Sequence, residues 1–372
     1  MKRRMFLQSV LAGSAVLAGN GWLGKETRGV EPARIAEGKK WYDWAKLPME
    51  GRAWEGEERA TPFGRFPKRW LEKVPSAVAS LSTHSAGMVA HFQTNARQIW
   101  LRCSVTDTNL AMPHMPATGK SGFDLYGRDA AGKFRFIKNV VPKEGDLPLG
   151  ENLPGDEREY LIYLPLYNGT RTMELGLPEE ASFSLVTRQE RPILFYGTSI
   201  MQGGCASRPG MAHASILGRR LDRAFWNFGF SGNGRMEEVM AEAFGELDPA
   251  VYVLDCLPNM NPTLVSERTV PFVRKLREKR PDTPILLVED RVFPCSWIQS
   301  GRAEFHRQNQ AALKSSYEKL LADGETGLHY LTHESLLSED GEGTVDNSHP
   351  TDYGFICYAN ATEGILREIL NR

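Results

Sequence analysis

Residues 193–203, with the sequence ILFYGTSIMQG, join an apolar block to a glycine-rich turn that carries a serine. Four consecutive apolar residues such as Ile193–Tyr196 are typical of a strand buried on both faces, and Val251–Leu254 and Ile285–Val288 repeat the pattern. Stretches long enough for helices lie between and after these blocks, at 211–224, 235–244, 265–279, 302–322 and 353–370. Strand and helix in alternation predict βαβ units, and therefore a flavodoxin-like parallel sheet with helices on both faces.

The sequence before residue 190 has a different pattern. Polar and apolar residues alternate in 98–105 and 158–164, and clusters of glycine, proline, asparagine and aspartate, such as 142–154, separate these short runs. This pattern predicts an all-β sandwich or jelly-roll-like domain over residues 40–188. The α/β domain then covers 190–372, and a chain of 372 residues is long enough for two domains.

The first residues resemble an export signal. Lys2, Arg3 and Arg4 precede the small and apolar run 10–19, which is too short to span a bilayer. The pair of arginines before Met-Phe-Leu resembles a twin-arginine signal, and an ordinary secretory signal with two arginines is the alternative. We expect an export signal peptide over residues 1–25, and a periplasmic or extracellular protein with no stable membrane span.

The composition indicates a soluble globular protein, with 41% hydrophobic and 24% charged residues. The formal net charge is -1 and no basic tract stands out, so we expect no nucleic-acid partner. The histidines, carboxylates and five cysteines lack the spacing of metal ligands. We therefore expect neither a metal nor a cofactor.

Ser199 lies where a predicted buried strand ends, which in an open α/β sheet is the edge where ligands bind. Gly197 and Gly203 allow a tight turn around it, and the first N–H groups of the following helix can hold an anion. A plain turn serine that caps a helix gives the same local pattern.

Asp346 and His349 supply the groups that would turn Ser199 into a nucleophile. A hydroxyl needs a base within hydrogen-bond reach, and histidine can both accept and return the proton at neutral pH. A carboxylate on the other ring nitrogen fixes the tautomer. Three residues apart in one loop, Asp346 and His349 can supply both groups.

Two further blocks follow predicted strands and could bind an oxyanion. Gly232 lies in the glycine-rich run 229–234, and Asn259 follows the strand block 251–254. With the amide of Ser199, the N–H of Gly232 and the side chain of Asn259 would make an oxyanion hole. Loop chemistry alone also favours glycine and asparagine at such positions.

These four blocks, in this order, resemble the SGNH (GDSL-type) hydrolase superfamily over residues 190–372. Gly197-Thr198-Ser199 resembles the Gly-Asp-Ser block, with threonine in place of aspartate, and Leu257-Pro258-Asn259-Met260 replaces Gly-x-Asn-Asp. The resemblance implies the SGNH fold, Ser199, His349 and Asp346 as catalytic residues, and Ser199, Gly232 and Asn259 as the oxyanion hole.

The first domain carries a second resemblance. Residues 112–116, MPHMP, and 122–126, GFDLY, are similar to the Gly-x-Asp-Leu-Tyr domain that precedes some SGNH esterases. Residues 208–211, RPGM, and 232–235, GNGR, agree with the same subgroup. The superfamily includes carbohydrate O-acetylesterases, lipases and thioesterases.

Several residues allow two interpretations. Cys205 and Cys256 could form a disulfide or remain buried thiols. His114 could reach the cleft, although a structural histidine is the safer interpretation for it and for His91. Residues 289–291, EDR, could contact substrate or form an ion-paired strand end.

Together these features predict an exported serine ester hydrolase that works through an acyl-enzyme, with a carbohydrate O-acetylesterase as the first interpretation. The expected partner is a glycan or small-molecule ester. A lipid or longer-chain acyl esterase, and a non-catalytic glycan-binding protein on an SGNH scaffold, are the alternatives.

Overall fold

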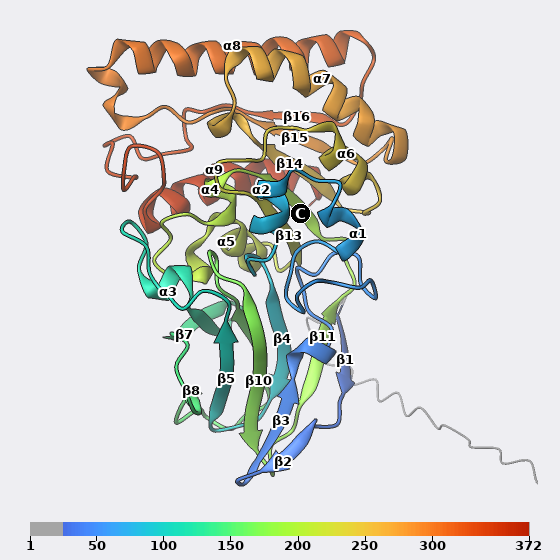
Figure 1. Cartoon of the computed structure of the whole chain (residues 1–372), viewed down its shortest axis with the longest axis vertical. Coiled ribbons are helices and arrows are strands. Elements are labelled where there is room, and N and C mark those ends of the chain that lie inside the picture. Colours follow the sequence, from blue (N-terminus) through green and yellow to red (C-terminus); the bar gives the residue numbers. More distant parts are fainter. Residues whose placement is uncertain (1–24, 372) are drawn as a thin grey trace, which may run out of the picture.

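The computed structural model describes residues 25–371 (Figure 1). The expected export signal at 1–25 lies outside the described residues except for its last position, so export stays a prediction of the sequence. Within the described part of the chain, no helix is long and apolar enough to cross a membrane.

A five-stranded parallel sheet forms the centre of the C-terminal half, in the order β13-β12-β14-β15-β16. Its strands are β12 (Ile193–Gly197), β13 (Phe225–Gly229), β14 (Val251–Asp255), β15 (Ile285–Val288) and β16 (Leu328–Leu331). The prediction of a parallel sheet is therefore confirmed. The sequence did not predict β16, because this edge strand is short and three of its four side chains are only half-buried.

The side chains of each central strand alternate between two apolar cores, as the period of two in a strand requires. Leu194 and Tyr196 of β12 join one core, whereas Ile193 and Phe195 join the other. Helices cover both faces of the sheet (Figure 1). The first core takes α6 (Glu238–Gly245), α7 (Pro262–Lys279) and α8 (Ser300–Ala322), and the second takes α5 (His213–Arg220) and α9 (Asp352–Ile369).

Some helices begin or end away from their expected limits. The expected helix 211–224 is divided into a 3-10 turn at Pro209–Met211 and the shorter α5, because Ala212 between them has an extended ψ of 137°. Helix α6 begins three residues after the expected 235, and the glycine-rich loop therefore extends to Glu237.

Two antiparallel sheets form the N-terminal half, and their facing side chains share one core, as in a sandwich. The first sheet contains β1 (Lys25–Gly29), β11 (Ser184–Arg188), β4 (Val89–Thr94), β9 (Arg158–Tyr163), β6 (Phe123–Arg128) and β7 (Phe134–Val140). The second contains β2 (Arg34–Ala36), β3 (Lys39–Asp43), β10 (Thr170–Pro178), β5 (Ile99–Val105) and β8 (Leu147–Gly150). The expected β-rich region is confirmed.

Short helices fill the connections: α1 (Lys68–Leu71), α2 (Ser76–Leu81), α3 (Ala117–Lys120), and 3-10 turns at Trp44–Lys46, Leu257–Asn259 and Pro294–Trp297. Trp54, Trp70 and Val78, around α1 and α2, pack into the core of the parallel sheet and not into that of the sandwich. A segment from the first half thus covers the second half.

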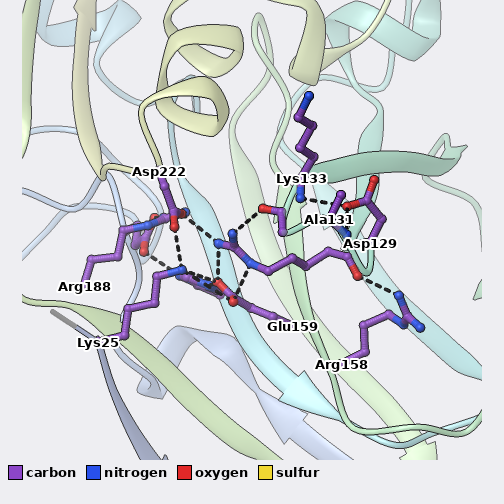
Figure 2. Close-up of polar contacts among 12 residues, drawn as sticks. Lys25, Asp129, Ala131, Lys133, Arg158, Glu159, Arg188 and Asp222 are labelled. Carbon is purple, nitrogen blue, oxygen red and sulfur yellow. Dashed lines mark hydrogen bonds and ion pairs between the residues drawn. The ribbon is translucent and has the colours of Figure 1, made fainter. Parts of the chain in front are cut away.

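A buried ionic network joins the two halves (Figure 2). Asp222, between α5 and β13, binds Lys25, Arg128 and Arg188 of the sandwich at 2.9, 2.7 and 2.9 Å. Glu159 on β9 binds Lys25 and Arg128 in turn at 3.0 and 2.7 Å. Burial alone would raise the pKa of Asp222, but Arg188 and the other cations lower it. Because all five groups are charged, the halves are held in one orientation.

The GxDLY motif forms a second junction. Asp124 is fully buried and accepts hydrogen bonds from the N–H of Gly210 at 2.7 Å and from Arg208 at 3.1 Å. The Tyr126 hydroxyl also contacts Arg208. A Cβ on Gly210 would lie 2.4 Å from that hydroxyl, so only glycine fits. The motif therefore fastens the sandwich to the loop that follows Ser199.

Candidate active site

Ser199 is the first residue of α4 (Ser199–Gln202), the short helix that follows β12. The side chain of Thr198 caps this helix and accepts from the N–H of Ile200 at 3.3 Å. Gly197 is required where β12 passes the main chain of β14, since a Cβ there would lie 2.4 Å from the carbonyl oxygen of Asp255. Gly203, with a φ of 104°, ends the helix. The serine is thus held in a tight turn at the carboxyl end of the sheet.

His349 lies between Ser199 and Asp346. Its Nε2 is 2.8 Å from the Ser199 Oγ, and its Nδ1 is 2.8 Å from the Asp346 Oδ2. A ring that donates its Nδ1–H to the carboxylate leaves Nε2 free to accept the serine proton. The structure therefore brings the three expected catalytic residues into one hydrogen-bonded row.

Asp346 is held by its own loop. Its Oδ1 accepts from the backbone N–H groups of His349 at 2.8 Å and Ser348 at 3.1 Å. Partial burial opposes ionisation of Asp346, but these bonds and the His349 ring outweigh it and lower the pKa. The carboxylate stays charged at neutral pH and can stabilise an imidazolium.

Gly232 lies in a loop that is tied to the nucleophile turn. Phe230 donates its N–H to the Gly197 carbonyl at 3.0 Å, and Ser231 donates its N–H to the Gln202 side chain at 3.0 Å. Gly232 itself is exposed and has a φ of 68°. Within residues 25–371 its N–H donates to no other group of the protein. It can therefore donate to a ligand.

Asn259 does not point freely into the site. Its Nδ2 donates to the carbonyl of Asn233 at 2.5 Å, so this amide fastens the loop that carries Gly232. An asparagine amide has two N–H groups, and the second can still serve an oxyanion. The structure thus gives Asn259 a positioning contact that the sequence did not predict.

Two residues that the sequence did not single out support the site. Gln202, within the quoted block, binds the Leu166 carbonyl at 3.0 Å as well as the loop of Gly232. Tyr167 donates its hydroxyl to the Ser199 carbonyl at 3.1 Å. Only contacts between distant segments reveal these roles, so no local pattern could have shown them.

His114 comes from the sandwich half and reaches the triad. It lies exposed on a turn closed by two backbone hydrogen bonds between Met112 and Met115, at 2.8 and 3.1 Å. The centres of the His114 and His349 rings are 6.0 Å apart. His91 is structural, because it is buried between Glu50 and Glu159 at 2.6 and 2.5 Å.

Cys205 and Cys256 are both free and buried, so no disulfide joins them. Burial raises the pKa of Cys205 to about 12 and that of Cys256 well above its usual value. Both thiols therefore stay protonated at neutral pH, and neither is a nucleophile.

One group of metal-ligand type occurs within residues 25–371, namely Glu289, His333 and Glu334, whose ligand atoms lie within 4.8 Å of one another. The Glu289 carboxylate already accepts from Tyr330 at 2.7 Å and from the N–H of His333 at 3.0 Å, and Glu334 is exposed. These bonds give Glu289 a structural role at the end of β15.

Arg291 anchors the loop that carries the base. It is 1% exposed, and its guanidinium donates to the Ser348 carbonyl at 3.3 Å and to the Ser348 hydroxyl at 2.5 Å. Asp290 neutralises Arg291 and also binds His306 at 2.9 Å. Residues 289–291 are therefore an ion-paired strand end.

We expect Arg291→Lys to lower kcat for an aryl acetate by about 100-fold with little change in KM, because a shift of about 1 Å in a catalytic group has such an effect. Lysine keeps the charge beside Asp290 but cannot form both bonds to Ser348. Ser348→Ala removes only the hydroxyl bond and should give a smaller loss. Arg302→Lys on α8, whose guanidinium lies over Phe293, is the matched control. A folded Arg291→Lys protein with full kcat would contradict this positioning role.

Asp255, the last residue of β14, is a buried carboxyl group beneath the site. Burial raises its pKa to about 7, with nearby Asp290 adding to the effect and Arg291 opposing it. Its Oδ1 has no hydrogen-bond partner among the described residues. Ionisation of Asp255 therefore costs free energy in the folded state.

The pH dependence of stability tests whether ionisation of Asp255 destabilises the folded protein. Because the folded pKa of Asp255 lies above the ordinary value of about 3.9, stability falls as pH rises from about 4 to about 7 and is then level. Asp255→Asn removes this loss. The free energy of unfolding of the variant, relative to that of wild type, should therefore rise across that range by roughly 4 kcal/mol at most. Denaturant unfolding at a series of pH values measures it, with the exposed Asp282→Asn as control. A difference in the free energy of unfolding between variant and wild type that is constant with pH would contradict the raised pKa of Asp255.

The fold and the arrangement of Ser199, His349 and Asp346 define the class of SGNH hydrolases. Residues 190–367 match the GDSL-like lipase/acylhydrolase family, and residues 39–183 match the family described as the GxDLY N-terminus of SGNH-hydrolase-type esterases. A search of curated proteins found no match.

Solved structures agree with this class. A GDSL-like lipase from Bacteroides ovatus is 32% identical with a TM-score of 0.82, over 90% of this chain and 98% of that one. A salicylyl-acyltransferase from a tetracycline biosynthetic pathway is 17% identical with a TM-score of 0.72, over 93% and 99%. An acetyl xylan esterase from Butyrivibrio proteoclasticus is 13% identical with a TM-score of 0.58, over 90% and 99%. The chain belongs to the GDSL-like lipase/acylhydrolase family.

Proposed function

We propose that the chain is a serine ester hydrolase that removes acetyl groups from a carbohydrate. The observation that carries the proposal is the hydrogen-bonded row of Ser199, His349 and Asp346 at the end of β12. A protein that only binds glycan has no need of this row. Among proteins of this fold, the neighbour from Butyrivibrio proteoclasticus is an acetyl xylan esterase, so the fold is compatible with such a substrate.

The proposed reaction has two halves. The Ser199 Oγ attacks the ester carbonyl while its proton passes to the His349 Nε2, and the carbonyl oxygen becomes an oxyanion. The N–H groups of Ser199 and Gly232, with the free N–H of Asn259, hold that charge. His349 then gives its proton to the departing alkoxide, which leaves an acetyl ester on Ser199.

Water completes the cycle. His349 takes a proton from water, the hydroxide attacks the acetyl-enzyme, and the same donors hold the second oxyanion. The proton returns to the Ser199 Oγ as acetate leaves. Asp346 stays ionised throughout and stabilises the imidazolium in both halves.

We expect Ser199→Ala to lower turnover of an aryl acetate by roughly four orders of magnitude or more, because the nucleophile is lost while the fold persists. A fluorophosphonate probe should label the wild-type protein and leave the variant unlabelled. The exposed Ser335→Ala, in the same half of the chain, is the control and should keep both activity and labelling. A Ser199→Ala protein with most of its activity would exclude Ser199 as nucleophile. A folded wild type without labelling would favour a glycan-binding protein.

The acyl group is tested with aryl acetate, butyrate and octanoate. We expect kcat/KM for acetate to exceed that for butyrate by at least about tenfold, since each methylene in a small pocket changes discrimination by such factors. Acetate release from a panel of acetylated glycans then tests which alcohol part of the ester the enzyme accepts. A preference for octanoate would replace the deacetylase proposal with a longer-chain acyl esterase.

A further inference from the structure

A cavity adjoins the loop of the catalytic base. It has a volume of about 610 Å³ and lies between residues 292–297, which follow β15, and residues 337–343, which precede α9. Asn347 also lines it. Because Asn347 lies between Asp346 and His349 in the sequence, the cavity borders the loop that carries the catalytic base.

An exposed indole lies on one side of this cavity. Trp297 is 84% exposed, more than any other large hydrophobic residue within residues 25–371, and its neighbour Ile298 is 67% exposed. Leaving such a side chain in water forgoes about 2–3 kcal/mol of burial free energy. An exposed aromatic residue beside a cavity is therefore typical of a binding surface.

The rest of the lining combines acidic residues with apolar ones, among them Val292, Phe293 and Leu337. Glu339, Asp340 and Glu342 contribute three carboxylates, and no lysine or arginine lines the cavity within the described residues. The hydroxyl oxygen of Ser296 is buried there without a hydrogen-bond partner. These groups suit a ligand that has many hydroxyl groups and carries no negative charge, because hydroxyls donate to carboxylates whereas an anion would be repelled.

The leaving alcohol and the cavity are both next to the loop of the catalytic base. His349 must protonate the departing alkoxide, so the alcohol part of the ester lies within reach of the His349 Nε2. The loop that holds His349 is the loop that lines the cavity through Asn347. A chain of sugar residues that continues from the acetylated one can therefore extend into it.

We propose that the cavity at Trp297 is a subsite for the neutral sugar residues that flank the acetylated sugar, with the indole against the apolar face of a pyranose ring. Glu339, Asp340 and Glu342 accept hydrogen bonds from its hydroxyls. This subsite rests on the proposed function, since it names the part of the substrate that lies beyond the ester.

Kinetics of Trp297→Ala test the subsite. For acetylated xylo-oligosaccharides we expect KM to rise about tenfold with kcat nearly unchanged, while aryl acetate, which has no flanking sugar, is hydrolysed as by wild type. Trp297→Phe keeps an aromatic face and should recover most of the affinity. Leu321→Ala, which removes a 45% exposed side chain at the far end of α8, is the matched control. A folded Trp297→Ala protein with wild-type KM on the oligosaccharides would overturn the subsite.

A binding measurement separates the subsite from the esterase proposal. Ser199→Ala protein is titrated with unacetylated xylo-oligosaccharide, and we expect binding to quench its tryptophan fluorescence. The quenching should disappear in a protein that carries both Ser199→Ala and Trp297→Phe. A wild type that hydrolyses aryl acetate but no acetylated glycan would overturn the glycan esterase. In that case quenching that depends on Trp297 would leave the cavity as a sugar-binding site apart from the reaction, and the absence of quenching would overturn sugar binding as well. A polygalacturonate that binds as well as the neutral chain would overturn the role of the carboxylates.

Discussion

The bond between buried Arg291 and Ser348 is the interaction on which the site depends. The loop of Asp346 and His349 is neither helix nor strand, and apart from one bridge between Thr344 and Pro350 it has no regular backbone pairing. Arg291 ties this loop to the end of β15, and Asp290 supplies the opposite charge. A buried arginine that loses its partners destabilises the folded protein, so Arg291 depends on both Asp290 and Ser348. The position of His349 is thus set by the end of β15, through Arg291.

A similar constraint holds the sandwich half in place. Asp222 binds three cations of the sandwich, and Asp124 of the GxDLY motif binds the backbone of Gly210 just after the nucleophile turn. Both contacts join charged or buried polar groups, which are costly to leave unpaired. The turn that carries His114 therefore has a fixed position beside His349, which explains how a β-rich half can belong to the active site.

The sequence predicted the parts of the site that depend on strand ends. Ser199, Gly232 and Asn259 follow β12, β13 and β14, and parallel strands bring their carboxyl ends to one edge. Asp346 and His349 were found because three residues in one loop can carry both groups. Gln202 and Tyr167 could not be found in this way, and for Arg291 the sequence offered an ion pair but not its contact with Ser348. Each of these contacts reaches a segment more than 25 positions away. Their roles are properties of tertiary contacts.

The two sides of the ester are served by different parts of the chain. In the proposed reaction the carbonyl oxygen faces N–H groups at the sheet edge, at Ser199 and Gly232, whose positions are fixed by β12 and β13. The proposed alcohol leaves beside the His349 Nε2, and the His114 ring lies with its centre 6.0 Å from that of His349. Under this proposal the sheet edge positions the acyl chemistry, and the loops around His349 position the alcohol. Substitutions at His114 or Trp297 should change the choice of alcohol without moving the nucleophile, because within residues 25–371 neither side chain is hydrogen-bonded to the turn of Ser199.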